Sequence, residues 1–83
     1  MIARIHEIIR AEISDHVRRS PAPEIHSDAD LTADLAMDAL DRCCVTVAMD
    51  EEFGIMIPDS AMEGWETVAD IERTIQQMVG ALA

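Results

Sequence analysis

Aromatic residues and lysine are almost absent from this 83-residue sequence. It contains one Trp, one Phe and no Tyr, and all six of its strongly basic residues are Arg. With so few aromatic side chains, the core must be built from Ile, Val, Leu, Met and Ala, which suits packed helices. A chain this short can support only one hydrophobic core. We therefore expect a single all-α domain over residues 1–83.

Positive charge is also scarce, and this narrows the possible partners. Seventeen Asp and Glu residues against six Arg give a formal net charge of −11. Nucleic-acid binding depends on cationic contacts to phosphate, so we exclude it. Since 49% of the residues are apolar, a disordered acidic tail is excluded as well. Between residues 24 and 72, fourteen acids accompany Arg42 alone. A solvated surface is the simpler interpretation of such a segment, but this density favours basic protein partners.

Neither a disulfide framework nor a long apolar run is present. Cys43 and Cys44, the two cysteines, are adjacent, and neighbouring side chains diverge too much to bridge each other. Charged residues interrupt the apolar N-terminal segment, so it resembles neither a signal peptide nor a membrane span. We expect a monomeric, cytoplasmic protein that does not insert into membranes.

Apolar residues at spacings of three and four predict the first and last helices. The first stripe runs from Ile2 to Val17, in a helix expected to end near Arg19, before a segment containing two Pro. The last stripe runs from Val68 to Val79, in a helix expected to begin at a cap formed by residues 67–70 and to end at Gly80.

Two further helices are predicted from capping residues. Asp38 is a good N-cap for a helix over residues 39–52, which Gly54 should end. Asp59 or Ser60 can cap a one-turn helix that ends before Gly64. The long loop over residues 24–38 has apolar anchors, so we expect it to be ordered, with Thr32 or Asp34 capping a turn inside it. The result is a four-helix bundle with a long first loop and a short third helix.

No catalytic or metal-binding constellation is visible in the sequence. His6, His16 and His26 have no paired nucleophile or ligand spacing, so we interpret them as surface or loop residues. Asp28, Asp30 and Asp34 are spaced like ligands of an EF-hand. However, Ala occupies the sixth and twelfth positions, where that loop needs Gly and Glu. We expect neither an enzyme nor a specific metal site.

Two motifs together resemble the acyl carrier protein family over nearly the whole chain. The first is the run Asp-Leu-Ala-Met-Asp-Ala-Leu-Asp of residues 34–41, and the second is the run Met-Asp-Glu-Glu-Phe-Gly-Ile-Met-Ile-Pro-Asp of residues 49–59. The resemblance implies a carrier that presents an acyl group, held as a thioester on 4′-phosphopantetheine, to fatty-acid, lipid or polyketide enzymes. It also implies two kinds of partner with basic docking patches, namely phosphopantetheinyl transferase and acyl-processing enzymes.

One residue departs from the family motif at the position that matters most. Family members read Asp-Ser-Leu where this chain reads Asp38-Ala39-Leu40, and the Ser hydroxyl carries the prosthetic group. A methyl group cannot attack coenzyme A, so nothing can be attached at Ala39. Two explanations are open. In the first, which we favour because the flanking residues still match the motif, the natural protein has Ser here and this chain was changed to Ala. In the second, the chain is a natural non-carrier relative that acts as an acidic docking module. Ser60 also follows an Asp, but the residue after it is not Leu, so we do not interpret Ser60 as a substitute attachment site.

The resemblance also implies which face of the second helix meets partners. Both arcs of that helix are largely apolar, so periodicity alone does not assign them. By resemblance, the docking face comprises Leu40, Asp41, Cys44, Val47 and Glu51. The opposite arc, which includes Cys43, is then expected in the core, so only Cys44 should be reachable by solvent. An apolar cleft for the acyl chain is expected among Ile57, Met62, Val68 and Ile71.

Overall fold

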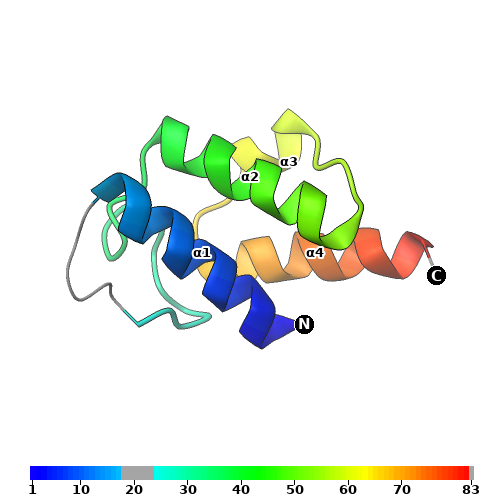
Figure 1. The fold of residues 1–83 in the computed structure, drawn as a ribbon, viewed down its shortest axis with the longest axis horizontal. Helices are drawn as coiled ribbons and strands as arrows, with labels where there is room; N and C mark the ends of the chain where they lie inside the picture. The colour runs from blue at the N-terminus through cyan, green and yellow to red at the C-terminus, as the bar shows by residue number, and fades with distance from the viewer. Residues whose placement is uncertain (18–23, 83) are drawn as a thin grey trace.

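The computed structural model describes residues 1–17 and 24–82, and these residues form four helices. They are α1 (Ile2–Val17), α2 (Ala39–Phe53), α3 (Asp59–Glu63) and α4 (Val68–Leu82). In Figure 1, α2 and α4 run in roughly the same direction, and α1 crosses in front of them in the opposite sense. The all-α prediction, with its short third helix, is therefore confirmed. Arg18 and Arg19 lie outside the described residues.

One hydrophobic cluster joins the helices and the long loop. Ile5, Ile9 and Ile13 of α1 are fully buried, as the stripe predicted, and Val68, Ile71 and Ile75 supply the same kind of surface from α4. Burying each such side chain stabilises the fold by roughly 1.5–3 kcal/mol. From α2 the cluster takes Val45 and Met49. The four anchors of the loop, Ile25, Leu31, Leu35 and Met37, are all at most 7% exposed.

The long loop is ordered because it pairs with the segment before α4. Leu31 N donates to Glu66 O at 2.9 Å, and Val68 N donates to Ala29 O at 3.1 Å. The turn inside the loop is capped by Asp30, whose Oδ1 accepts from the amides of residues 32 and 33. Asp34 contributes by accepting from the amide of Asp30 at 2.7 Å. The acids that resembled calcium ligands thus include two that stabilise a turn.

Two helix ends differ from the sequence predictions. Neither Asp59 nor Ser60 caps α3: Pro58 is the N-cap residue and makes no side-chain cap bond. Pro58 suits the start of a helix because its φ is fixed at about −65° and because an amide hydrogen has no partner within the helix there. Helix α4 continues past Gly80 to Leu82, because Gly80 does not adopt the positive φ that would end it. Gly54 does end α2 in that way, with φ 64° and ψ 41°.

Candidate functional site

Ala39 is the first residue of α2 and lies exposed at the surface. Asp38, the N-cap residue, accepts from the amide of Asp41 at 2.9 Å, as its prediction as a cap requires. The first amides of a helix have no carbonyl partner within it, and the helix dipole is positive there. The helix dipole at this turn favours an anionic group such as a phosphodiester, while the carboxylates of Asp38 and Asp41 already occupy part of the helix start. The Ala39 side chain does not suit covalent attachment, because it has no hydroxyl.

Asp41 completes the cap and is buried, although we expected it on the docking face. Its Oδ2 accepts from the amide of Asp38 at 3.0 Å, which makes the cap reciprocal, and the residue is only 4% exposed. A carboxylate held against the backbone cannot meet a basic group on a partner. The periodic pattern placed Asp41 at the edge of the docking arc. Its position three residues after Asp38, the same spacing as in the cap of residues 67–70, is the local signal that its side chain turns back to the N-cap.

The remaining expected docking residues lie on the exposed side of α2. Leu40 and Val47 are 61% and 57% exposed, which is unusual for apolar side chains of this size, and Glu51 is exposed beside them. Cys44 is only partly exposed. An open hollow of about 320 Å³ borders this surface, lined by Glu12, Cys43, Cys44, Val47, Ala48 and Glu51.

The expectation that Cys43 lies in the core is wrong. Cys43 is exposed, and it shares the outer side of α2 with Ala39 and Val47, four residues away in each direction. The true buried arc of α2 consists of Asp41, Val45, Thr46 and Met49. Burial, together with nearby acids, raises the pKa of the Cys44 thiol above its usual value. Cys43 is therefore the thiol that solvent reaches more easily.

The four expected cleft residues sit together, three of them in the closed core. Ile57, Val68 and Ile71 are at most 7% exposed, and Met62 packs against the same cluster while partly exposed. Trp65, which the sequence reasoning did not assign, is buried beside them at 3% exposure. The sequence offered a signal for it, since it is the only Trp and lies between the third and fourth helices.

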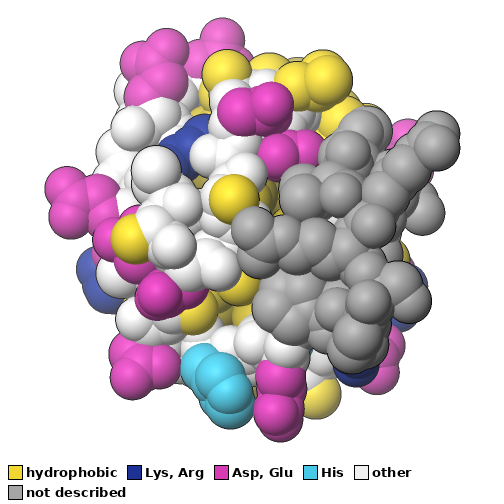
Figure 2. Space-filling view, turned by 90° about the vertical axis from the view of Figure 1, so that its left-hand side faces the viewer, with side chains coloured by type: hydrophobic (Ala, Val, Ile, Leu, Met, Phe, Trp, Pro, Cys, Tyr) yellow, Lys and Arg dark blue, Asp and Glu magenta, His cyan; other side chains and the backbone are white. Residues whose placement is uncertain are grey.

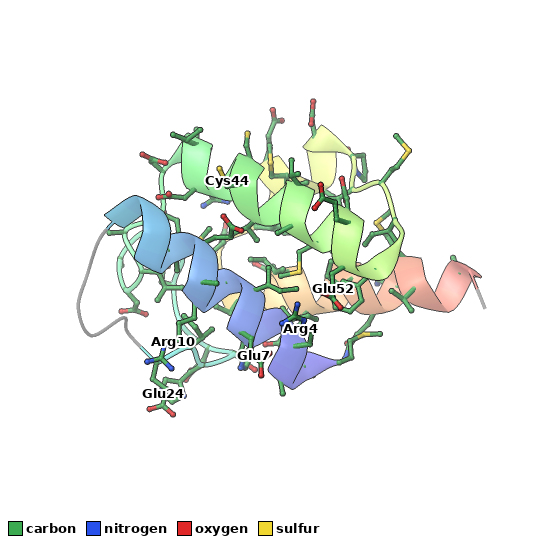
Figure 3. The ribbon with its side chains drawn as sticks, viewed as in Figure 1. Arg4, Glu7, Arg10, Glu24, Cys44 and Glu52 are labelled. Carbon is green, nitrogen blue, oxygen red and sulfur yellow. The ribbon has the colours of Figure 1, made fainter. Side chains whose placement is uncertain are left out.

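Polar contacts hold the helices in this arrangement. Arg4 of α1 donates to Glu52 of α2 at 2.6 Å and to Glu7 at 3.1 Å, and Figure 3 shows Arg4 lying between these two acids. The bond from Arg4 holds the pKa of Glu52 below its usual value. His6 Nε2 lies 2.8 Å from Glu72 Oε2, and Ser27 Oγ donates to the same oxygen at 2.7 Å.

His6 therefore differs from its interpretation as a surface residue. Its side chain is 23% exposed and that of Glu72 is 11% exposed, so the pair joins α1 to α4 at a partly buried place. His26 is exposed as expected. The side chain of His16 lies outside the described part of the structure. Among the described residues, no group of three His, Cys, Asp or Glu side chains could hold a metal ion.

Acidic side chains are distributed over the surface near the start of α2. Figure 2 views the end of the molecule that lies at the left in Figure 1, and acids occur at many places around the described part of that face. In the part of the chain that the structure covers, no helix is long and apolar enough to cross a membrane. Dispersed acids around an apolar patch suit brief encounters with a basic protein surface.

Comparison with known proteins assigns the chain to a family. Residues 7–75 match the model of a family described as "Phosphopantetheine attachment site". The acyl carrier protein of Phenylobacterium zucineum (strain HLK1) is 36% identical over 75 residues, which cover 90% of this chain and 94% of that protein. That of Thermosynechococcus vestitus (strain NIES-2133 / IAM M-273 / BP-1) is 33% identical over 79 residues, covering 95% and 96%.

The chain therefore belongs to the acyl carrier protein family. Members of this family are carriers and not catalysts, and their prosthetic group is 4′-phosphopantetheine. A third relative, the acyl carrier protein of Saccharopolyspora erythraea, is 38% identical over 63 residues, which cover 76% of this chain and 66% of that protein. Ala39, the first residue of α2, has no hydroxyl through which such a group could be bonded.

Proposed function

We propose that residues 1–83 act as one acyl carrier domain when position 39 is Ser, and that the chain with Ala39 is a form that docks without being loaded. The observation that carries this proposal is the start of α2. There an exposed first residue follows a fully formed cap, and Leu40 is 61% exposed beside it. A transferase needs access to this first turn, and the fold provides that access without any rearrangement.

The proposed docking surface is the exposed side of α2, defined by Leu40, Cys43, Val47 and Glu51. Cys43 takes the place of the expected Cys44, because Cys43 is exposed and Cys44 is only partly exposed. Asp41 is left out because it is buried in the cap. Leu40 and Val47 supply an apolar centre, and the surrounding acids steer a basic partner toward it. We propose phosphopantetheinyl transferase and acyl-processing enzymes with basic patches as these partners, meeting a monomeric carrier in the cytoplasm. Fatty-acid, lipid and polyketide pathways all use partners of this kind.

Loading is tested with Ala39→Ser. Ser is only slightly worse than Ala inside a helix and is better at its start, so the variant should fold as the parent does. Incubated with a broad-specificity transferase, magnesium and coenzyme A, the variant should gain the mass of one phosphopantetheine. The parent chain, which retains Ser60, is the matched control and should gain none. A folded variant that gains no mass would favour the alternative function, an acidic docking module without cargo.

The docking surface is tested by placing a positive charge in its apolar centre. Leu40→Arg or Val47→Arg should weaken binding to the transferase by about tenfold or more, because central apolar contacts carry most of the affinity in small interfaces. Met56→Arg is the matched control, since Met56 is 86% exposed and lies outside α2. Equal weakening by all three variants would mean that net charge, rather than this surface, governs binding.

A further inference from the structure

An open groove runs along the surface between α1 and α2. It consists of two hollows of about 350 and 320 Å³, whose linings share Glu12, Ala48 and Glu51. Because the two hollows have these residues in common, they form one continuous space, which we call the α1–α2 groove. Figure 3 shows Arg4 and Glu52 together near one end of α2 and Cys44 nearer its other end.

Each of the two helices presents one stripe of its surface to the groove. On α1 the lining residues recur at helical spacing and are Arg4, Glu7, Ile8, Ala11 and Glu12. On α2 they are Cys43, Cys44, Val47, Ala48, Glu51 and Glu52. At about 1.5 Å per residue, stripes of this extent are about 12–14 Å long. The groove is therefore bounded by about two turns of each helix.

Small side chains form the floor of the α1–α2 groove. Ala11 of α1 is exposed, Ala48 of α2 is partly exposed, and Ile8 lies beneath them at 7% exposure. An alanine side chain ends at Cβ, so a third helix resting on this floor can approach both helices at the usual interaxial distance of about 8–10 Å. The floor suits the apolar face of a helix.

Carboxylates stand on both walls above this floor. Glu7 and Glu12 belong to α1, Glu51 and Glu52 belong to α2, and these four acids against Arg4 give the lining a net formal charge of −3. A complementary partner has an apolar stripe with cationic side chains along both of its edges, because each edge then meets one acidic wall. A basic amphipathic helix has this surface.

We propose that the α1–α2 groove binds a basic amphipathic helix of a partner protein. The groove shares Cys43, Val47 and Glu51 with the docking surface, so this inference rests on the proposal that this side of α2 meets partners, and it extends that surface onto α1. A long acyl chain would bring no cation to the acids on the walls. A second copy of this chain, with its net charge of −11, would bring further carboxylates.

The probe is a designed helical peptide of about 16 residues with Leu and Ala on one face and Arg along both edges of that face. A second peptide has the same composition in an order that spreads Leu around the helix. Binding to the full chain is measured by isothermal titration calorimetry at about 0.15 M salt, which screens attraction between distant charges. The amphipathic peptide should bind at least about tenfold more tightly, because only this peptide combines the apolar stripe with flanking cations.

Ala11→Arg fills the floor of the groove and places a positive charge between its acidic walls. This variant should bind the amphipathic peptide about tenfold or more weakly. Ala3→Arg is the matched control, because Ala3 is another exposed alanine of α1 but is not part of the groove lining. The two variants have the same net charge, and Arg is nearly as good a helix former as Ala, so both should fold. Ala3→Arg should change the affinity by less than about threefold.

NMR of the parent chain locates the peptide without any substitution. The amide resonances of Ala11 and Ala48 should shift when the amphipathic peptide is added. Those of Ser60 and Gln77, which line a separate hollow at α3 and α4, should not shift. This measurement decides the site even if Ala11→Arg does not fold.

Four results would overturn the proposal. Absent or equal binding of the two peptides would show that the groove does not recognise an amphipathic helix. Equal weakening by Ala11→Arg and Ala3→Arg, or shifts confined to α3 and α4, would place the peptide elsewhere. Dimerisation of the parent that Ala11→Arg abolishes, measured by sedimentation, would make a second copy the occupant.

The proposed function has its own separate readout in transferase binding. If Leu40→Arg leaves transferase binding unchanged while the peptide results hold, the proposed docking surface is refuted and the α1–α2 groove is retained. If Leu40→Arg weakens transferase binding while the peptides bind equally, only the present inference fails.

Discussion

Asp41→Ala removes one half of the reciprocal cap that begins α2. The Asp38 amide then loses an acceptor at 3.0 Å, and the helix loses a negative charge in its first turn. A lost cap bond costs about 1 kcal/mol, and a partly buried amide left without an acceptor costs about 1 kcal/mol more. We expect a loss of about 2 kcal/mol in the free energy of unfolding, which lowers the melting temperature of a domain this small by about 8–16 °C.

Urea denaturation followed by circular dichroism measures this loss. The slope of the transition should stay unchanged, because the mutation removes a bond without changing the surface exposed on unfolding. Asp41→Asn keeps an oxygen acceptor but loses the charge, so it should cost only about 0.5–1 kcal/mol. Asp59→Ala is the matched control: Asp59 is exposed at the start of α3, where no side-chain cap bond exists, so its cost should stay within about 0.5 kcal/mol.

The same variants separate a structural role for Asp41 from a docking role. The cap predicts that Asp41→Ala loses stability and that Asp41→Asn recovers most of it. If Asp41→Ala is as stable as the parent yet binds a basic partner more weakly, the burial argument is refuted and Asp41 belongs to the docking surface.

Three further predictions concern thiols, acid and glycine. Cys43 should react with N-ethylmaleimide faster than Cys44, because burial raises the pKa of the Cys44 thiol, and peptide mapping that finds equal rates would contradict the exposure of α2. Two backbone N–H donors hold the pKa of Asp30 below its usual value. The stabilisation that Asp30 contributes is therefore present above the ordinary pKa of about 3.9 and is lost as the pH falls through the lower folded value. The melting temperature should decline below about pH 4, and a rise would refute this prediction. Gly54→Ala should cost about 1 kcal/mol through its positive φ alone, since no atom lies within 4 Å of the added carbon, whereas Gly80→Ala within α4 should stabilise by about 0.5–1 kcal/mol in the same urea assay.

Local patterns in the sequence were enough for most of the secondary structure. The isoleucine stripe of α1, the cap at Asp38 and the end of α2 at Gly54 all act within one or two turns of the chain. Such signals are readable because helix periodicity and capping depend on neighbouring residues. The comparisons confirmed the family resemblance, which predicts the attachment position at Ala39.

Contacts between distant residues could not be read in the same way. His6 meets Glu72 across 66 positions, and Arg4 meets Glu52 across 48, although neither pair has a local signature. For this reason the sequence did not predict that His6, which is partly exposed, has a partner on α4. A titratable side chain becomes part of the interior only when another helix brings it a partner.

The sequence alone determined that this protein is an acidic, four-helix member of the acyl carrier protein family, and it predicts the attachment position at Ala39. Only the tertiary structure decided which side of α2 faces solvent, because both of its arcs are apolar and the choice depends on where α1 and α4 pack. That packing exposed Cys43 and placed Arg42 against the carbonyl of Trp65. The physical reason is that periodicity specifies the faces of a helix, whereas burial is a property of the elements that cover them.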